Sequence, residues 1–364
     1  MAHIQMNTDV IVVGQGMAGT CLSYQFSRNN IDFMVIDNSH VRSSSMVAAG
    51  LINPVVFKRL TKSWMADELM SYLHTFYLEF EASIGTSFYD RKLILRVLNS
   101  AEEINRWDSK RSGSLKDYLG EICDESEFEL PLNKSANLGV VKAGAIDVPA
   151  MLAAWKNRLK EAGNIIENNL DYSMIEYGEN KVKIQFKSDS LVGKKIVFCE
   201  GALGVNNPLF SWLPFNLSKG DILTLRNDKY LGGEVLNNGK FFLPQSDGTI
   251  KMGSTYEWDD LSYETKKERR EELQEKAKET LSGDTILIKH EAGIRPTVKD
   301  RRPFLGRHPI QKNAYIFNGL GTKGAMLAPC FSEQILNFVM NEGSLDQEVD
   351  IKRFIGELGT FVVS

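Results

Sequence analysis

Three glycines near the start of the chain are spaced in a way that can hold a phosphate. Gly14, Gly16 and Gly19 form a GxGxxG pattern in the stretch "DVIVVGQGMAG", directly after four apolar residues. The first glycine permits a tight turn, the second lets backbone N–H groups approach a pyrophosphate at a helix N-terminus, and the third lets helix and strand pack closely. The chemistry that this spacing indicates is dinucleotide binding.

The residues around these glycines predict the elements that must position them. Residues 9–14 are expected to form a buried parallel strand, a helical spacing of apolar residues follows from Gly16, and a second strand at 32–37 ends on Asp37. An acid at this place can accept hydrogen bonds from a ribose hydroxyl, and the strand–helix–strand context makes the glycine pattern specific. The alternative is a glycine-rich turn with a solvated Asp37. The glycines alone do not distinguish NAD from FAD.

Composition excludes several classes of protein. The 364 residues are 43% hydrophobic and carry a formal net charge of −4, which argues against a dedicated nucleic-acid binder. The four cysteines are far apart without a CxxC pair, and the five histidines are scattered, so neither a disulfide framework nor a metal cluster is expected. No apolar run approaches the roughly 20 residues that cross a bilayer. The start lacks the charged and apolar blocks of a signal peptide, and the protein is expected to be cytoplasmic.

The rest of the chain alternates helical and strand-like patterns. Residues 43–54 are small and polar and predict a loop that can lie against a cofactor. Helices are expected at 62–83, from residue 101, and at 144–163, 265–281 and 321–340; strands are expected at 88–98, 174–188 (a hairpin), 195–204, within 220–258 and at 314–320. A β-hairpin layer followed by a return to the nucleotide sheet is more typical of flavoproteins than of simple NAD dehydrogenases. Without a linker between them, two interleaved domains are expected.

Several motifs carry a family resemblance, in order, over nearly the full length of the chain. They are the glycine turn with Asp37, "SSSMVAAGLINP", "GAIDVPAML", "IVFCEGALG", "KGD" (219–221), "LPQSDGTIKMGST", "AGIRPTVKDRRPFLGRHP" and "NGLGTKGAMLAP". With these motifs the chain resembles the D-amino-acid oxidase superfamily of FAD enzymes. Within it, the chain is most similar to glycine oxidase and to the oxidase half of the bifunctional enzyme that matures the wobble uridine side chain of tRNA.

The resemblance implies an α/β fold (α+β overall) with two interleaved domains. A Rossmann-like FAD-binding domain would comprise residues 1–80, 141–218 and 288–364, and an antiparallel-sheet substrate domain would comprise 81–140 and 219–287. FAD would be bound non-covalently, because "RPTVKD" lacks the cysteine that attaches flavin in sarcosine oxidases.

The resemblance also implies which residues hold FAD. They are Gly14, Gly16, Met17, Ala18, Gly19, Asp37, Ser44, Ala49, Gly50, Gly201, Arg295, Gly321, Thr322, Lys323, Gly324, Ala325 and Met326. The second glycine turn, residues 321–325, would bring backbone N–H groups near flavin N1 and C2=O, where negative charge accumulates on reduction. Lys323 either adds a full positive charge there or is a surface lysine on a loop.

Three residues are expected to act in catalysis: Arg295, Lys323 and Tyr256. Arg295 falls on the family arginine that clamps the substrate carboxylate, and its planar fork suits that role; the alternative is a structural ion pair with an acid such as Asp300 or Glu291. The substrate tyrosine of glycine oxidase falls on Phe241, so Tyr256 could supply a hydroxyl instead. An apolar or larger amine is therefore favoured over glycine. No side-chain base is required, since the cofactor carries the chemistry.

The expected function is oxidation of the C–N bond of an amino acid or secondary amine, with hydride passing to flavin N5 and oxygen giving hydrogen peroxide. Two alternatives remain open: the oxidative step of tRNA wobble-uridine modification, favoured by a basic cluster (Lys299, Arg301, Arg302 and Arg307), and a dehydrogenase that passes electrons to a quinone or carrier protein. The expected partners are a small amine or amino acid and oxygen or another acceptor, with homo-oligomers possible. The residues leave open the identity and stereochemistry of the substrate.

Overall fold

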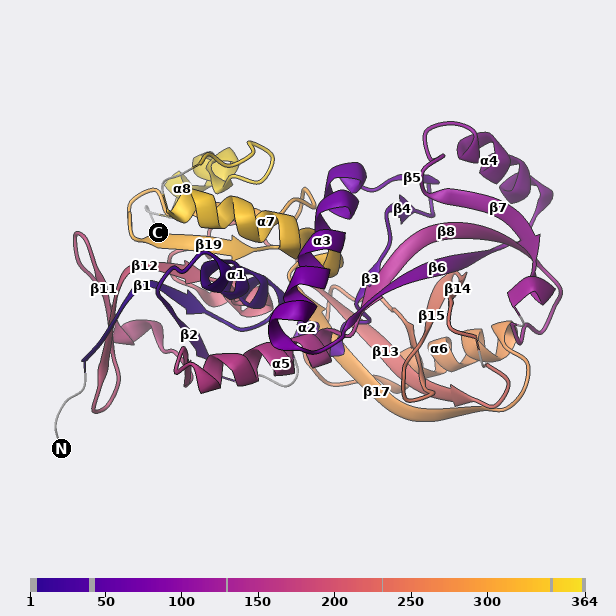
Figure 1. Ribbon diagram of the computed structural model, residues 1–364, viewed down its shortest axis with the longest axis horizontal. Coiled ribbons are helices and arrows are strands. Elements are labelled where there is room, and N and C mark those ends of the chain that lie inside the picture. The colour runs from indigo at the N-terminus through magenta and orange to yellow at the C-terminus, as the bar shows by residue number, and fades with distance from the viewer. Residues whose placement is uncertain (1–4, 39–42, 129, 231, 341–342, 362–364) are drawn as a thin grey trace.

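The computed structural model describes residues 5–38, 43–128, 130–230, 232–340 and 343–361. Two sheets dominate it, an eight-stranded sheet and a nine-stranded sheet. Figure 1 shows the first sheet on the left and the second on the right, with helix α3 (Ala66–Ile84) standing between them in this view. The predicted α/β fold class is confirmed.

The first sheet is mainly parallel and is built around β1. Its strands are, in spatial order, β10 (Ile175–Tyr177), β11 (Val182–Gln185), β12 (Ser190–Phe198), β1 (Gln5–Val13), β2 (Phe33–Asp37) and β9 (Ile165–Glu167), with β19 (Ala314–Asn318) on β12 and β18 (Phe304–Arg307) on β19. The strands from β12 to β9 and the pair β12–β19 are parallel, whereas the β10–β11 hairpin, as predicted, is antiparallel.

Three helices pack together beside this sheet. They are α1 (Met17–Arg28), α5 (Val148–Glu161) and α7 (Gly324–Val339). Helix α1 packs against both α5 and α7, which explains why its side chains from Met17 to Phe26 are all buried. Helix α5 starts after Asp147, whose side chain caps it by accepting a hydrogen bond from the Ala150 N–H.

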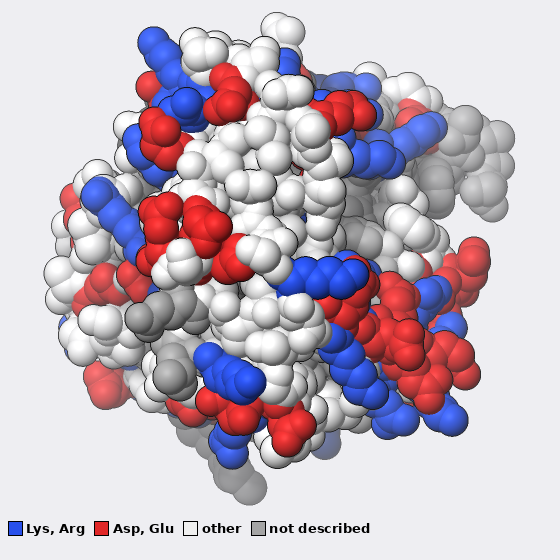
Figure 2. Space-filling model, turned by 90° about the vertical axis from the view of Figure 1, so that its right-hand side faces the viewer, with Lys and Arg blue, Asp and Glu red and all other residues white. Residues whose placement is uncertain are grey.

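The second sheet is almost entirely antiparallel. Its order is β17 (Thr285–Arg295), β13 (Ser218–Asn227), β16 (Ile250–Gly253), β15 (Lys240–Pro244), β14 (Val235–Asn238), β6 (Tyr89–Leu98), β8 (Asn137–Ile146) and β3 (Leu51–Ile52), with β7 (Leu119–Asp124) on β8. Only the pair β14–β6 is parallel among these described strands. Helix α6 (Lys267–Thr280) buries Leu273 and Ala277 against this sheet. Figure 2 views this end of the molecule, where acidic and basic residues are interleaved.

Shorter elements complete the described chain. They are α2 (Ser44–Val47), β4 (Val55–Val56), β5 (Thr61–Lys62), α4 (Ala101–Arg111), η1 (Glu125–Phe128), η2 (Tyr172–Met174), η3 (Gly201–Asn206), η4 (Ile351–Phe354) and α8 (Ile355–Phe361). Within the described ranges, no helix has both the length and the apolar character that a bilayer span requires.

Two local expectations need correction. Residues 43–54 were expected to be a loop, but they contain α2 and β3; the Ser43 side chain caps α2 by accepting a hydrogen bond from the Met46 N–H. Residues 144–146, expected at the start of a helix, extend strand β8 instead, because they pair with β3 and β6. The division into two domains stays a prediction; the strand pairing places β3 and β17 in the second sheet.

Candidate active site

One large cavity lies where the two sheets meet, with a volume of about 720 Å³. Its walls include residues 13–18, 36–38, 43–51, 199–203, 293–296 and 320–326. It is lined by both glycine turns and by the ends of β13 and β17, so segments from the whole length of the chain meet around it.

The first glycine turn is tightly built. Gly14 has a φ of +98°, and a Cβ on Gly19 would lie 1.8 Å from the Gly14 carbonyl oxygen, so neither position accepts a larger residue without a shift. The N-cap residue of α1, Gly16, has no side chain to cap the helix, and the Met17 N–H donates to Ser45 Oγ at 3.1 Å. The helix therefore presents its N-terminus to the cavity, which suits an anion such as a pyrophosphate.

Asp37 ties this turn to the end of β2. One carboxylate oxygen accepts a hydrogen bond from the Gln15 N–H at 2.9 Å, and Asp37 also lines the cavity. The Gln15 side chain is buried and donates to Thr20 Oγ1 and to the Leu152 carbonyl, both at 3.0 Å. Gln15 was missed by the sequence analysis. It fixes the turn that carries the glycines.

The segment around α2 forms another wall of the cavity. The predicted cofactor residues Ser44, Ala49 and Gly50 all line it. Gly50 is anchored to the second sheet, since its carbonyl accepts a hydrogen bond from the Ile146 N–H at 3.0 Å. The side chain that contacts the first glycine turn is Ser45, the neighbour of the predicted Ser44. The serine run in this segment was the available signal.

The second glycine turn leads into α7 beside the first. Gly321, Thr322, Gly324, Ala325 and Met326 line the cavity, as predicted for cofactor residues. Helix α7 also starts without a side-chain cap in the described structure, and α1 and α7 pack side by side. Two helix N-termini therefore meet the same cavity, so two positive ends of helix dipoles can act on one elongated ligand.

Lys323, at the start of α7, lies in the cavity wall and not on an open surface. Its ammonium donates to the Asn53 carbonyl at 3.4 Å and to the hydroxyl of Ser63. Burial lowers the pKa of Lys323 to about 8. At pH 7 Lys323 is therefore mostly protonated, and it loses its positive charge as the pH rises through 8.

Glu200 is a second residue that the sequence analysis missed. It follows β12, next to the predicted Gly201, and both line the cavity. Its carboxylate accepts hydrogen bonds from the Tyr172 hydroxyl at 2.7 Å and from the Asn207 amide at 2.8 Å. Burial raises the pKa of Glu200 to about 7, although both hydrogen bonds oppose the shift. An acid in the otherwise apolar stretch "IVFCEG" was the signal for it.

Arg295 ends β17 with its guanidinium held by carbonyls. Nη1 donates to the carbonyls of Lys219 and Thr255, and Nη2 to that of Thr255, all at 3.3 Å. The central guanidinium carbon lies 4.6 Å from the centre of the Tyr256 ring. Burial lowers the pKa of Arg295 within its high range.

The two acids that could have paired with Arg295 have other partners. Asp300 accepts from Arg353 at 2.9 Å, and Glu291 pairs with Lys289 at 2.7 Å. Among the described residues, no salt bridge to a carboxylate joins Arg295. Its charge lies in the cavity wall and is available to an anionic ligand.

Aromatic side chains line the cavity that holds Arg295, and one of them, Tyr256, contacts it. Tyr256 is 49% exposed, lines the cavity and stacks on Trp258 with 5.9 Å between ring centres. Phe241 and Tyr263 line the cavity too, and Tyr263 was missed by the sequence analysis. The structure thus brings Arg295 and Tyr256 together, while Lys323 is anchored separately at Asn53 and Ser63.

The fold and the cavity define the class of this protein. Residues 9–335 match the model of the DAO family, described as FAD dependent oxidoreductase. The chain belongs to this family and is an FAD-dependent oxidoreductase, and the predicted resemblance is confirmed. The cofactor FAD fits the two uncapped helix starts and the close-packed glycine turn.

Similarity to individual proteins extends over most of the chain. It is 23% identical to the glycine oxidase of Pseudomonas aeruginosa over 345 residues, covering 89% of this chain and 92% of that protein. It is 29% identical to glycine oxidase of Bacillus subtilis over 143 residues, 38% of this chain and 37% of that one.

Two solved structures show the same fold. The iminodiacetate oxidase of Chelativorans sp. BNC1 superimposes with a TM-score of 0.80 at 19% identity, over 95% of this chain and 98% of that one. The glycine oxidase of Geobacillus kaustophilus gives a TM-score of 0.78 at 16% identity, over 96% of this chain and 98% of that one.

Proposed function

We propose that this chain is an amine or amino-acid oxidase that oxidises a C–N bond by hydride transfer from the substrate carbon to flavin N5. Oxygen then takes the electrons and gives hydrogen peroxide. The observation that carries the proposal is Arg295, a guanidinium held by carbonyls in the wall of the cavity that both glycine turns line. The glycine oxidases and the iminodiacetate oxidase among the similar proteins support the same class of substrate.

Arg295 binds and orients the substrate in this proposal. Its fork donates two parallel hydrogen bonds to a carboxylate, which fixes the direction of the neighbouring C–H bond. Tyr256 stacks on the guanidinium and limits its rotation. A lysine could supply the charge but not the planar fork, so arginine is the better residue for this geometry.

The start of α7 supplies electrostatic stabilisation. With FAD bound, its N–H groups and the Lys323 ammonium would stabilise the negative charge that the cofactor takes up on reduction. None of the described residues that line the cavity is a histidine, and the reaction needs no side-chain base: a neutral amine releases hydride from its carbon, and the resulting imine is hydrolysed by water.

The side chains near Arg295 favour a substrate with an apolar substituent. Phe241 cannot donate a hydrogen bond to a carboxylate, and Ile222 lines the cavity as well. Tyr256 and Tyr263 add ring surface, on which an apolar group buries area from water. Glycine itself would leave these surfaces without a contact.

The visible spectrum of the purified protein, recorded anaerobically before and after adding amines, tests the proposal. The panel runs from glycine, sarcosine and proline to D- and L-amino acids with bulky side chains. Flavin bands that bleach with one compound support the proposal and name the substrate class, and oxygen consumption during turnover separates an oxidase from a dehydrogenase. Bands that never bleach with any amine contradict it.

The tRNA hypothesis stays a prediction. Within its basic cluster, Arg302 donates to Glu348 at 3.1 Å and lies 4.3 Å from the centre of the Trp64 ring. Its charge is therefore partly neutralised by a contact within the chain. Salt-sensitive tRNA binding would support the hypothesis, because phosphate contacts make affinity fall steeply with salt.

A further inference from the structure

The motif "KGD" at residues 219–221 has no role yet in the proposed function, although it starts β13 directly beside Arg295. Ser218 and Arg295 are paired across β13 and β17. A Cβ on Gly220 would lie 1.7 Å from Nη2 of Arg295, so Gly220 leaves room for the guanidinium. Asp221 accepts a hydrogen bond from the Thr255 hydroxyl at 3.0 Å. This bond holds Thr255, whose carbonyl in turn accepts from Arg295. The remaining residue of the motif is Lys219, whose charged side chain is almost completely buried.

Lys219 is a lysine with a side chain only 1% exposed, and its partners belong to one segment. The ammonium donates to Asp260 Oδ2 at 3.0 Å, to Ser262 Oγ at 3.4 Å and to the Glu264 carbonyl. We call residues 256–264 the aromatic segment, because Tyr256, Trp258 and Tyr263 lie in it. Burying an ammonium costs several kcal/mol unless it is paired and fully hydrogen-bonded, and here the aromatic segment supplies all these partners.

The backbone of Lys219 holds the start of the same segment. Its N–H donates to the Glu257 carbonyl at 2.8 Å, and its carbonyl accepts from the Glu257 N–H at 3.0 Å. The same carbonyl accepts from Nη1 of Arg295 at 3.3 Å. Lys219 therefore contacts both sides of the substrate site, the arginine through its carbonyl and the aromatic segment through its ammonium.

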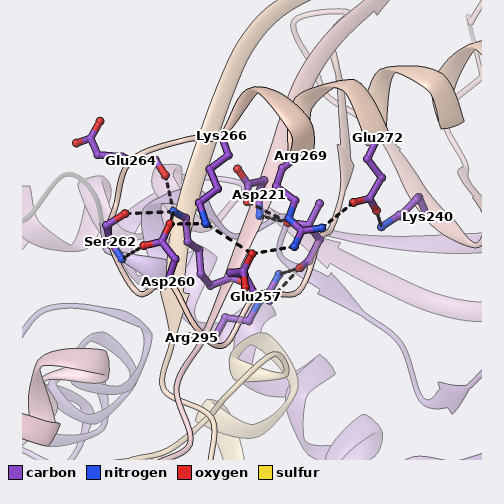
Figure 3. A network of polar contacts seen from close by, with 12 residues as sticks. Asp221, Lys240, Glu257, Asp260, Ser262, Glu264, Lys266, Arg269, Glu272 and Arg295 are labelled. Carbon is purple, nitrogen blue, oxygen red and sulfur yellow. Dashed lines mark hydrogen bonds and ion pairs between the residues drawn. The ribbon is translucent and has the colours of Figure 1, made fainter.

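A second set of ion pairs holds the segment at Asp260 and Glu257 (Figure 3). Lys266 lies 3.0 Å from the same oxygen of Asp260, and Arg269 lies 2.8 Å from Glu257. The Lys266 side chain is 42% exposed, so water screens its pair, and exposed pairs contribute little to stability. The inner contact, from Lys219, is the one that can fix the position of the segment.

We propose that Lys219 is a positioning residue of the substrate site. Its ammonium fixes the aromatic segment so that Tyr256 rests on Arg295, and the substrate carboxylate and its apolar substituent bind at this pair. Lys219 does not line the cavity itself, and it acts through the residues it holds. This inference rests on the proposed function for its substrate, but not for the contact between Lys219 and the segment.

The test compares Lys219→Met with Lys266→Met in the FAD-loaded protein. Both variants remove a cation 3.0 Å from Asp260, one buried and one exposed. We expect Lys219→Met to keep its flavin but to raise the KM for the reducing amino acid, and the Kd for acetate, by about tenfold or more, since small misplacements of a clamp are costly. The limiting rate of flavin reduction should change by less than about threefold. For Lys266→Met, the KM, the Kd for acetate and the limiting rate should all stay within about twofold of those of the unchanged protein.

Hydrogen exchange of residues 254–266 provides a readout without substrate. Lys219→Met should exchange its amides in this segment faster than both the unchanged protein and Lys266→Met. If no amine reduces the unchanged protein, the proposed function fails while this measurement still tests Lys219. Faster exchange with an unchanged Kd for acetate overturns the positioning role, and unchanged exchange overturns the inference altogether.

Asp260→Asn covers the case in which Lys219→Met does not fold. It weakens the same contact from the more exposed partner and keeps the buried ammonium hydrogen-bonded to Ser262 and Glu264. Faster exchange and a raised KM, both beyond the values of Lys266→Met, are the expected result. If the exchange rates and the KM of Asp260→Asn equal those of Lys266→Met, the inference is overturned.

Discussion

The central guanidinium carbon of Arg295 lies over the Tyr256 ring, 4.6 Å from the ring centre, and both residues line the cavity. The two carbonyls that bind the guanidinium come from Lys219, in the neighbouring strand β13, and from Thr255, which follows β16 and directly precedes Tyr256. The orientation of this arginine is therefore set by two separate segments, the start of β13 and the residues that follow β16.

Replacing Arg295 by lysine tests its role as the carboxylate clamp. Arg295→Lys keeps the charge and loses the fork, and kcat/KM for the amino acid should fall by about 30-fold or more, as expected for losing about 2–5 kcal/mol of a charge-assisted pair. FAD content should not change. Arg302→Lys, which alters an arginine stacked on Trp64 away from the cavity, is the control. A normal KM in the Arg295→Lys variant would show that Arg295 does not bind the substrate carboxylate.

Gly220→Ala should displace the arginine without removing it. The added Cβ would meet Nη2 of Arg295 at 1.7 Å, so the guanidinium has to leave its carbonyl partners. The KM should rise by roughly 10- to 100-fold with the flavin spectrum unchanged. Gly233→Ala is the matched control, because a Cβ there meets nothing within 4 Å. Equal KM values for the two variants would contradict the close approach of Gly220 to Arg295.

Gly19→Ala should prevent FAD binding. Its Cβ would lie 1.8 Å from the Gly14 carbonyl, and the turn and α1 would have to separate. We expect the variant to be purified without flavin, with a Kd for added FAD at least about 100-fold higher, measured by quenching of flavin fluorescence. Gly356→Ala, at an exposed helical position with open space around it, should bind FAD normally. Normal FAD affinity in Gly19→Ala would place the cofactor elsewhere.

Lys323→Met should lower the reduction potential of the flavin in a pH-dependent way. At pH 7 the ammonium favours the negatively charged reduced flavin, and its loss should lower the two-electron potential by about 30 mV, which corresponds to about 1.4 kcal/mol. Because the pKa of Lys323 is about 8, the difference should close at pH 9.5. Dye-equilibrated titrations measure both potentials, with Lys276→Met, in a surface ion pair with Glu279, as control. A difference independent of pH would exclude the lysine charge as its cause.

Glu200→Gln should remove a pH dependence of stability. The native pKa of about 7 lies above the ordinary value of 4.5, so the folded state holds this proton more tightly than the unfolded state does. The stability that Glu200 contributes is therefore complete below about pH 4.5 and is lost as the pH rises through 7, by up to about 3 kcal/mol.

The glutamine variant should match the unchanged protein at pH 4.5 and exceed it in Tm at pH 8, both with saturating FAD. Its amide can still accept from Asn207 and donate to the Tyr172 oxygen, so the hydrogen bonds persist. Equal Tm differences at the two pH values would show that folding does not raise the pKa of Glu200.

The first glycine turn could be predicted because its signals are local. The apolar run before Gly14, the glycine spacing and Asp37 all lie between residues 10 and 37. The structure places them in one β–α–β unit. The helix at 44–47 could not be predicted in the same way. Its Ser43 cap is local, but α2 also packs on β17, as the contact of Ser44 and Val47 with Gly293 shows.

Arg295 could be identified from its motif, whereas its surroundings depend on long-range pairing. Lys219 and Thr255 reach it only through the register of β13 with β17 and through the chain that returns after β16. Tyr263 had no distinguishing signal, since one aromatic among many does not show which surface it faces. Glu200 was the exception, because a charged residue at the end of an apolar strand can be noticed without a structure.

The pairing of β12 has a consequence for the biosynthesis of this protein. One edge of β12 binds β1, from the beginning of the chain, and the other binds β19, which precedes the second glycine turn. The ribosome must deliver nearly the whole chain before this sheet and the start of α7 can close around the cavity, and pairings so distant in sequence form slowly. Capture of FAD is therefore expected only after the second glycine turn and the start of α7 have been synthesised and have folded onto this sheet.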